Sequence, residues 1–381
     1  MPDKKRVLVF IDWYLPGYKA GGPIQSIVNL VRNLEKEFDF FIVTSNIDLD
    51  EPEPYTGIVF NSWIQNGNHQ VIYLDQKNQN FQKYRELLSE REYDCIYFNS
   101  MFSPNFTLKP LLLTYKFPKI KVILAPRGML GKGALQIKKR KKLFFLNLFK
   151  FSGIYRRITW HATTEPEASR IRIQFGLNSR ILIAPNLSAI NSNDIPMKYK
   201  EEDDLNLYTL SRISSIKNLK GALEYLGNVN LRYKISFTII GPIEEEQYWL
   251  ECQEQIKKLP ENIHVKHLGA IPNHLLKERL KDQHFMLLPT FHENYGHVIM
   301  ESWQNGCPVI ISDRTPWANL LEKNIGFDIS LAESSEFINA IERAAAMNNL
   351  EFQKWSRASY VFAKAKTQDP ASLEKYRRLF Q

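Results

Sequence analysis

Two glutamates near the C-terminal third, Glu293 and Glu301, are separated by seven residues around a glycine. The apolar run Phe285–Pro289 predicts a buried parallel strand, and the apolar spacing of Gly296–Gln304 predicts a helix that begins beside the glycine. Free backbone N–H groups and the positive end of that helix suit a phosphate or a sugar hydroxyl, and carboxylates suit vicinal diols. The pattern therefore favours a sugar-nucleotide site. The alternative is one glutamate at a helix start and one solvated glutamate.

Two patterns in the chain imitate metal sites. The pair His292-Glu293 resembles part of a zinc motif, but that motif needs histidines four residues apart on one helix, and His297 is five residues from His292 across a glycine. The pair Asp48 and Asp50 has the spacing of aspartates that hold a divalent cation, but it lies in an acidic loop, so we expect solvated surface. The sequence predicts no metal and no other cofactor.

Length and composition agree with a cytosolic enzyme. The chain has 381 residues, of which 44% are hydrophobic and 24% charged, enough for two domains with full cores. Its 3 cysteines are scattered, which favours reduced thiols over a disulfide framework. The apolar run Val7–Ile11 is stopped by Asp12 and is too short for a signal peptide or a membrane span. We therefore expect a cytoplasmic protein.

The positive charge is concentrated in the first half of the chain. Residues 1–190 hold 27 Lys and Arg against 16 Asp and Glu, whereas the remainder holds 23 against 25. No acidic residue occurs from Cys95 to Thr164, and this window contains the basic and aromatic segment Lys138–Phe151. Such a segment suits a helix on anionic lipid and predicts peripheral membrane contact. The alternatives are a core segment with solvated lysines and, more weakly, nucleic-acid binding without a recognition motif.

Short apolar runs alternate with amphipathic segments in both halves of the chain. This alternation predicts α/β architecture with two parallel sheets covered by helices on both faces. A polar, asparagine-rich stretch, Pro185–Asp204, is the expected linker between them. The predicted strands of the two halves are Val7–Ile11, Phe38–Thr44, Val71–Leu74, Cys95–Phe98, Lys121–Ala125, Ile158–His161 and Ile181–Ala184, then Leu205–Leu210, Ile235–Ile240, Ile263–Leu268, His284–Leu288 and Pro308–Ile311.

Ligands of open α/β sheets bind at the carboxyl ends of the strands, so the loops there are expected to carry the chemistry across a common cleft. After the first strand, Gly21 and Gly22 precede a helix and allow close backbone approach to a phosphate or sugar, although paired glycines are usually only a turn. After the first strand of the second half, Arg212 and Lys217 could clamp a diphosphate. A solvated loop is the alternative for that pair.

Together these features resemble family 4 of the retaining glycosyltransferases, which have the two-domain GT-B fold. The resemblance covers most of the chain in order and spacing. It is carried by Gly21-Gly22, Ala125–Leu130, His161–Glu165, Pro185-Asn186, Arg212, Lys217, Gly241-Pro242, Leu268-Gly269, Glu293, Glu301 and Gly306–Asp313.

The resemblance implies a role for each matching residue. Glu293 would meet donor-sugar hydroxyls and Glu301 the ribose diol, while Arg212 and Lys217 would neutralise the pyrophosphate in place of a metal ion. Glu293, Arg212 and Lys217 are then the expected catalytic residues. The remaining expected donor-binding residues are Gly21, Gly22, Gly241, Leu268, Gly269, Asn294, Tyr295, Gly296, His297 and Val298. The implied mechanism is front-face displacement with retention of configuration, in which the leaving phosphate accepts the proton of the acceptor hydroxyl.

The chain departs from the family pattern on the acceptor side. Arg127 stands where many relatives have a histidine, and arginine cannot act as a base but can bind an anionic or hydroxyl-rich partner. The stretch Asp313–Trp317 replaces a glycine-rich segment, which leaves that part of the pocket undefined. His161 is a further acceptor-side candidate, with a buried structural histidine as the alternative.

The sequence thus predicts an acceptor-side Rossmann-like domain over residues 1–187, completed by a final helix at about 366–381. A linker over 188–204 leads to a donor-binding domain over 205–365. The expected function is transfer of a sugar from a nucleotide diphosphate donor to a saccharide or lipid-linked acceptor at the inner face of the cytoplasmic membrane, as in capsule, O-antigen or exopolysaccharide assembly. A nucleotide-sugar epimerase and a non-catalytic binding protein are the rival interpretations.

Overall fold

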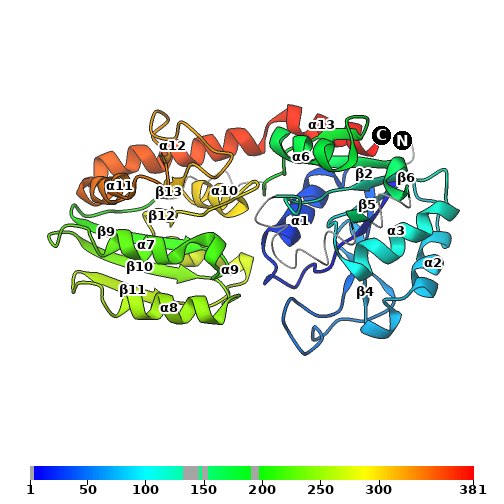
Figure 1. Cartoon of the computed structure of the whole chain (residues 1–381), viewed down its shortest axis with the longest axis horizontal. Helices are drawn as coiled ribbons and strands as arrows, with labels where there is room; N and C mark the ends of the chain where they lie inside the picture. Colours follow the sequence, from blue (N-terminus) through cyan, green and yellow to red (C-terminus); the bar gives the residue numbers. More distant parts are fainter. Residues whose placement is uncertain (1–3, 132–145, 148–152, 190–196) are drawn as a thin grey trace. The chain divides into compact units, whose positions relative to one another are not determined.

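A computed structural model describes residues 4–131, 146–147, 153–189 and 197–381. The chain divides into two compact units. Unit 1 comprises Met1–Ile190 together with Asp369–Gln381, and unit 2 comprises Asn191–Gln368. Unit 1 is therefore discontinuous in sequence, and its last segment follows the whole of unit 2 (Figure 1).

Unit 1 contains a sheet with the strand order β3-β4-β2-β1-β5-β6-β7-β8. All neighbouring strands are parallel except β3 and β4, which form an antiparallel pair. The inner strands are continuous apolar runs because both faces of a parallel sheet are covered by helices. The strands are β1 (Lys5–Phe10), β2 (Phe38–Ser45), β3 (Trp63–Asn66), β4 (His69–Leu74), β5 (Cys95–Phe98), β6 (Lys121–Leu124), β7 (Ile158–Ala162) and β8 (Arg180–Ile183).

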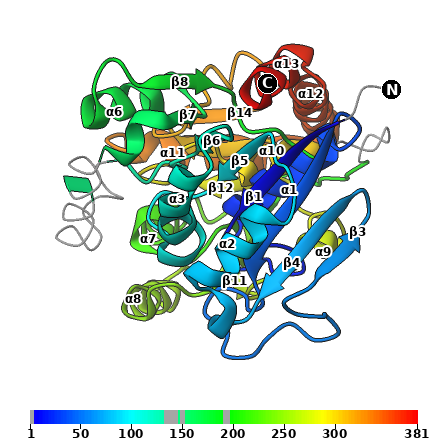
Figure 2. The ribbon, with the colours of Figure 1, turned by 90° about the vertical axis from the view of Figure 1, so that its right-hand side faces the viewer.

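Helices cover both faces of this sheet. One hydrophobic core joins the sheet to α2 (Phe81–Ser89), α3 (Lys109–Leu113) and α6 (Glu165–Phe175). Figure 2 shows α2 and α3 in front of the strands. A second core joins the opposite face to α1 (Gly22–Leu34) and to α13 (Pro370–Phe380).

Unit 2 contains a parallel sheet with the order β11-β10-β9-β12-β13-β14. One face packs on α7, α8 and α11, and the other on α9 and α10, while α12 contributes to both cores. The strands are β9 (Asp204–Leu210), β10 (Lys234–Ile240), β11 (Ile263–His267), β12 (Phe285–Leu288), β13 (Val309–Ser312) and β14 (Gly326–Ile329). The helices are α7 (Leu219–Leu226), α8 (Glu246–Ile256), α9 (Asn273–Arg279), α10 (His297–Gln304), α11 (Ser334–Ala346) and α12 (Asn349–Thr367).

In each sheet the direction in which successive strands are added reverses once, and we call this point the winding reversal. In unit 1 the chain winds outward from β1 toward β2 and β4, then from β5 toward β8, so the reversal lies between β1 and β5. In unit 2 the reversal lies between β9 and β12. Crevices form where the connections leave on opposite faces, and ligands of open α/β sheets bind there.

The predicted fold class, two parallel α/β domains, is confirmed. Two short strands, β3 and β14, were not predicted. Each has four residues, and β14 (Gly-Phe-Asp-Ile) carries a glycine and an aspartate, so its apolar pattern is too weak to identify it. The predicted membrane segment Lys138–Phe151 lies outside the described residues apart from Leu146 and Asn147, of which Leu146 is buried in the first core.

The end of the predicted linker packs on unit 2. Lys198 donates from Nζ to the carbonyls of Lys281 at 3.0 Å and Gln283 at 2.9 Å. Lys200 donates to the carbonyls of Ala345 at 2.7 Å and Met347 at 2.8 Å, at the C-terminal end of α11. Burial lowers the pKa of Lys200 to about 8. Lys198 and Lys200 are therefore buried parts of unit 2 and not of a free linker.

Candidate functional site

The loops that follow β9 and β12, at the winding reversal of unit 2, bring together Lys217 and Glu293 of the predicted donor site. The loop after β12 is joined to the loop after β9 because Phe291 N donates to Ile216 O at 2.9 Å and the Thr290 hydroxyl donates to the same carbonyl at 3.0 Å. Lys217 and Glu293, which are far apart in sequence, consequently meet with Nζ and Oε2 2.7 Å apart. Lys217 and Glu293, two residues of the predicted donor site, thus lie in one loop cluster.

The Lys217–Glu293 pair is shielded, with the two side chains 16% and 17% exposed. Burial alone would raise the pKa of Glu293, but the charge and hydrogen bond of Lys217 outweigh burial and leave this pKa below its ordinary value. Glu293 is therefore an anion at neutral pH. It also accepts a hydrogen bond from its neighbour Asn294 N at 3.2 Å, which fixes the carboxylate.

Glu301 lies in α10 in a different environment. Its Oε1 accepts a hydrogen bond from Asn273 Nδ2 at 3.3 Å, and no ion pair reaches it among the described residues. Burial raises the pKa of Glu301 to about 7. The two glutamates therefore differ in charge state near neutral pH, with Glu293 ionised and Glu301 poised between its two forms.

Gly296 makes the turn into α10. Its φ of 78° lies in the left-handed region, and a Cβ at this position would meet Ile299 Cδ1 at 2.7 Å and Glu293 Cγ at 3.1 Å. No side chain caps the helix at this end within the described part of the chain. The turn thus places the start of α10 next to Glu293.

The stretch Asp313–Trp317 is hydrogen-bonded to the loop between β12 and α10. Glu293 N donates to Arg314 O at 3.0 Å, and Trp317 Nε1 donates to Tyr295 O at 2.7 Å. The Tyr295 ring also contacts the rings of Trp317 and His297, with centroids 5.5 and 5.0 Å apart. The segment that the sequence left undefined therefore supports the backbone around Tyr295.

Arg212 lies in the same loop as Lys217 but is paired with a residue that the sequence did not single out. Its guanidinium forms an ion pair with Glu244, and both side chains are more than one third exposed. The neighbouring Glu245 accepts hydrogen bonds from Ser215 N at 3.1 Å and Ser215 Oγ at 3.3 Å. The acidic run after β10 could have indicated such partners, because it follows the strand next to β9.

The ends of β9, β10 and β11 are in tight backbone contact. A Cβ on Gly241 would lie 1.8 Å from Ser211 O, so only glycine fits. Gly241 N donates to Gly269 O at 2.8 Å, and Leu268 N donates to Ile239 O at 2.9 Å. Leu268 is 41% exposed, and a Cβ on Gly269 would meet no atom within 4 Å. The surface around these two residues is therefore open, as a main-chain contact with a base requires.

In unit 1, Gly21 precedes α1 with a φ of 63°, and Gly22 is the first residue of that helix. The loop before them is held by Asp48, whose Oδ2 accepts hydrogen bonds from Tyr18 N at 2.9 Å and Lys19 N at 3.2 Å. Asp48 is only 7% exposed, so its interpretation as solvated surface was wrong. A carboxylate that satisfies loop N–H groups is a structural element rather than a metal ligand.

Arg127 follows β6 with a φ of 53°, in the left-handed region. Its guanidinium donates to Asn99 Oδ1 and Tyr97 Oη, at 2.6 and 2.7 Å, and also to Asn186 Oδ1. The predicted acceptor-side arginine is therefore half-buried and held by Tyr97, Asn99 and Asn186 of its own unit. Glu167 holds the following residue, because its Oε1 accepts a hydrogen bond from Gly128 N at 2.6 Å.

His161 is fully buried, and both ring nitrogens are hydrogen-bonded. Nδ1 lies 2.7 Å from Tyr97 Oη, and Nε2 lies 2.8 Å from Ala184 O. Burial, followed by the charge of Arg127, lowers the pKa of His161 to about 3. This placement is the structural alternative weighed for His161, and an acceptor cannot reach the ring without displacing its partners.

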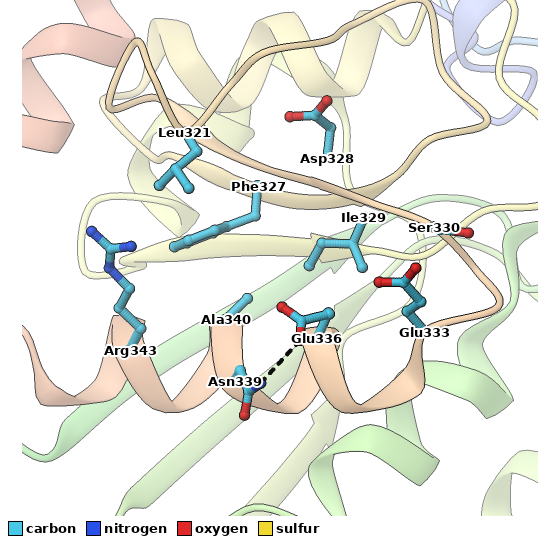
Figure 3. A pocket seen from close by; sticks show the side chains of 10 residues that line it. All are labelled: Leu321, Phe327, Asp328, Ile329, Ser330, Glu333, Glu336, Asn339, Ala340 and Arg343. Carbon is cyan, nitrogen blue, oxygen red and sulfur yellow. Dashed lines mark hydrogen bonds between the residues drawn. The ribbon is translucent and has the colours of Figure 1, made fainter.

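A pocket of about 340 Å³ lies elsewhere in unit 2, between β14 and α11 (Figure 3). Phe327, Ile329 and Ala340 line it together with charged side chains, and none of its lining residues belongs to the predicted site. Among the residues that the structure describes, no group of His, Cys, Asp or Glu could hold a metal ion. No helix in those same ranges is both long and apolar enough to cross a bilayer.

Comparison with known proteins agrees with this arrangement. Residues 192–360 match the family model of the glycosyl transferases group 1. A search of curated proteins finds no significant match.

Solved structures resemble the whole chain. Anabaena Alr3699/HepE in complex with UDP and glucose has a TM-score of 0.66 at 15% identity, covering 98% of both chains. WaaG, a glycosyltransferase involved in lipopolysaccharide biosynthesis, has a TM-score of 0.69 at 14% identity over 98% of this chain and 99% of the other. The E. coli trehalose-6-phosphate protein bound with UDP-2-fluoro glucose has a TM-score of 0.66 at 12% identity over 99% of both. The chain thus has the GT-B fold of glycosyltransferases, and its residues 192–360 match glycosyl transferases group 1.

Proposed function

We propose that this protein is a glycosyltransferase that takes its sugar from a nucleoside diphosphate donor bound to unit 2. The observation that carries the proposal is the Lys217–Glu293 pair, which lies at the winding reversal between β9 and β12. It lies in one loop cluster with Arg212 and precedes the uncapped start of α10. Cations and helix N–H groups suit a diphosphate, and carboxylates suit the hydroxyls of a sugar and a ribose.

In this proposal each of the site residues of unit 2 binds a different part of the donor. Glu293 binds hydroxyls of the donor sugar, and Glu301 binds the ribose diol. Arg212 and Lys217 stabilise the diphosphate as it leaves, so that no metal ion is required. The leaving phosphate then takes the proton of the acceptor hydroxyl, and the configuration at the anomeric carbon is retained. Support comes from the family match and from solved relatives whose crystals contain UDP or UDP-sugars.

The donor proposal is tested by ligand-induced stabilisation. Thermal unfolding with UDP-, GDP-, ADP- and dTDP-sugars should show a rise in apparent Tm for one base, because a ligand that binds only the folded state stabilises it. Magnesium and EDTA should leave the shift unchanged. A protein that no nucleotide sugar stabilises would contradict the proposal.

The substitution Glu293→Ala tests the proposed role of Glu293 in sugar transfer. It should lower turnover about 100-fold or more, as removal of a group that binds the reacting sugar does. Glu254→Ala, an exposed glutamate on α8 paired with Lys257, is the matched control and should behave as wild type. Full activity of Glu293→Ala would exclude the assigned role. Formation of an isomeric sugar without any acceptor would instead indicate an epimerase.

We further propose that the acceptor is a saccharide or a lipid-linked saccharide. The reaction would then belong to surface polysaccharide assembly at the inner face of the cytoplasmic membrane. It is supported by the basic and aromatic sequence Lys138–Phe151 and by the excess positive charge of residues 1–190. Liposomes with anionic lipid should sediment the protein at low salt and release it at high salt. Equal activity on a soluble sugar and a polyprenyl-diphosphate sugar, without liposome binding, would refute the membrane location.

A further inference from the structure

The acidic run that follows β10 lies against the loop that carries Arg212. Ile213 N donates to Pro242 O at 2.8 Å, and Glu244 N donates back to Ile213 O at 3.1 Å. Glu245 N donates to the same carbonyl at 3.2 Å. The two loops are therefore joined through their backbones, and the side chain of Glu244 starts from a fixed position beside Arg212.

The three glutamates of this run have different partners. Glu244 forms an ion pair with the guanidinium of Arg212. Glu245 accepts hydrogen bonds from the backbone N–H and the hydroxyl of Ser215, and so it fixes the loop. Glu246 is exposed and is the first residue of α8. Among the described residues, Glu244 is thus the carboxylate that neutralises the guanidinium assigned above to the diphosphate.

The two cations of the predicted donor site are both paired with carboxylates, but in different surroundings. The side chains of Lys217 and Glu293 are 16% and 17% exposed, whereas those of Arg212 and Glu244 are 39% and 37% exposed. Solvent screens an exposed ion pair and leaves it weak. The Arg212–Glu244 pair can therefore open and close, because Glu244 can turn into water while its backbone stays in place.

We propose that Glu244 competes with the bound diphosphate for Arg212. In the free protein Glu244 holds the guanidinium. When the donor binds, Arg212 exchanges this carboxylate for diphosphate oxygens, and after the transfer of the sugar Glu244 takes Arg212 back. Glu244 is a positioning residue that acts through Arg212. The inference rests on the proposed function for the role of Arg212, whereas the competitor itself is identified by the ion pair.

The competition has a consequence for the release of the product. A ligand that needs the guanidinium binds more weakly in proportion to the time that Arg212 spends paired with Glu244. The diphosphate left after transfer carries one more negative charge than the nucleotide sugar does, so an arginine without a competitor would retain it. Glu244 therefore shortens the time for which the spent nucleoside diphosphate occupies the site.

Titration calorimetry on the full chain tests the competition, with whichever of UDP, GDP, ADP and dTDP binds the wild-type protein most tightly. Glu244→Gln should lower the Kd about threefold, because the exposed pair no longer has to open. Glu246→Gln removes the same charge two residues away and is the matched control, which should change the Kd less than about 1.5-fold. When Arg212 is already replaced by alanine, adding Glu244→Gln should change the Kd less than about 1.5-fold, since the competition has no object.

The outcomes separate competition from other roles of Glu244. A Kd that Glu244→Gln leaves unchanged or raises would overturn the proposal, because Glu244 would then be inert or would orient Arg212 for the ligand. Equal gains in affinity for Glu244→Gln and Glu246→Gln would also overturn it, since they would indicate general repulsion of the anion. A gain that persists in the Arg212→Ala protein would do the same. If none of the four nucleoside diphosphates binds the wild-type protein, the donor site itself is refuted and the competition with it.

Discussion

At the scale of single residues, the two glutamates of unit 2 have the same charge type but different titration behaviour. Glu293 is held ionised by Lys217, whereas Glu301 accepts a hydrogen bond from the neutral amide of Asn273 and forms no ion pair among the described residues. The spacing of the two glutamates does not by itself distinguish their protonation states. The difference arises from partners that are distant in sequence, at positions 217 and 273, and so it follows from the fold.

Glu301 should make binding of UDP dependent on pH. Because its pKa is raised to about 7, the carboxylate that we propose as the acceptor of the ribose hydroxyls is lost by protonation as the pH falls below 7. The affinity for UDP should decrease about tenfold between pH 7.5 and 5.5. Titration calorimetry in buffers of different ionisation enthalpy should detect proton release at pH 6.5. In Glu301→Gln the pH dependence that comes from this residue should disappear, so that only the pH dependence caused by the phosphate of UDP remains.

The same pKa shift predicts an effect on folding. Since the folded-state pKa lies above the unfolded value of 4.5, the contribution of Glu301 to stability is fully present below pH 4.5 and is lost as the pH rises through about 7. Glu301→Gln should therefore raise Tm at pH 8 and leave it unchanged at pH 4.5. A lowered Tm at pH 8 would show that the charged form is stabilised by partners other than Asn273.

Arg127 is predicted to act as a structural residue of unit 1. Its hydrogen bonds to Tyr97, Asn99 and Asn186 join the ends of β5 and β6 to the segment after β8. Arg127→Lys cannot make all three, and we expect a loss of about 2–3 kcal/mol in the free energy of unfolding. Urea denaturation measures this loss. An unchanged stability with reduced acceptor binding would instead assign Arg127 to the acceptor.

At the scale of elements, the contact between the ends of β9 and β10 depends on one glycine. Gly241→Ala would place a methyl group 1.8 Å from Ser211 O, at a φ of 145°, and should cost about 3 kcal/mol or more. Gly269→Ala is the matched control, since it has a positive φ but no atom within 4 Å, and should cost about 1 kcal/mol. Equal costs for the two variants in urea denaturation would contradict the close contact.

The elements themselves were largely predictable from sequence because the apolar runs of buried parallel strands are distinctive. The helix starts at Gly22 and His297 were likewise marked by glycines. Most hydrogen-bonding partners were not predictable, since Asn273 and Glu167 carry no local signal, whereas Glu244 lies in an acidic run that follows the strand next to β9.

At the scale of the whole molecule, the last helix supplies part of the core of unit 1. Phe380 lies against Phe38, Phe40 and Tyr97, with ring centroids 5.4, 6.0 and 5.8 Å apart. Phe380→Ala should destabilise unit 1 by about 3–5 kcal/mol and leave the unfolding of unit 2 unchanged in calorimetry. The exposed neighbour Arg378→Ala should have little effect. A shift confined to unit 2 would contradict the assignment of α13 to unit 1.

The discontinuity of unit 1 also bears on how the protein emerges from the ribosome. Translation delivers residues 1–190 first, yet α13, which closes their second core, arrives only after all of unit 2 has been synthesised. Unit 2 is continuous and can complete its core earlier. The apolar face of the first sheet that α13 covers is therefore exposed for the time needed to translate roughly half of the chain, which makes it the surface most in need of chaperone protection during synthesis.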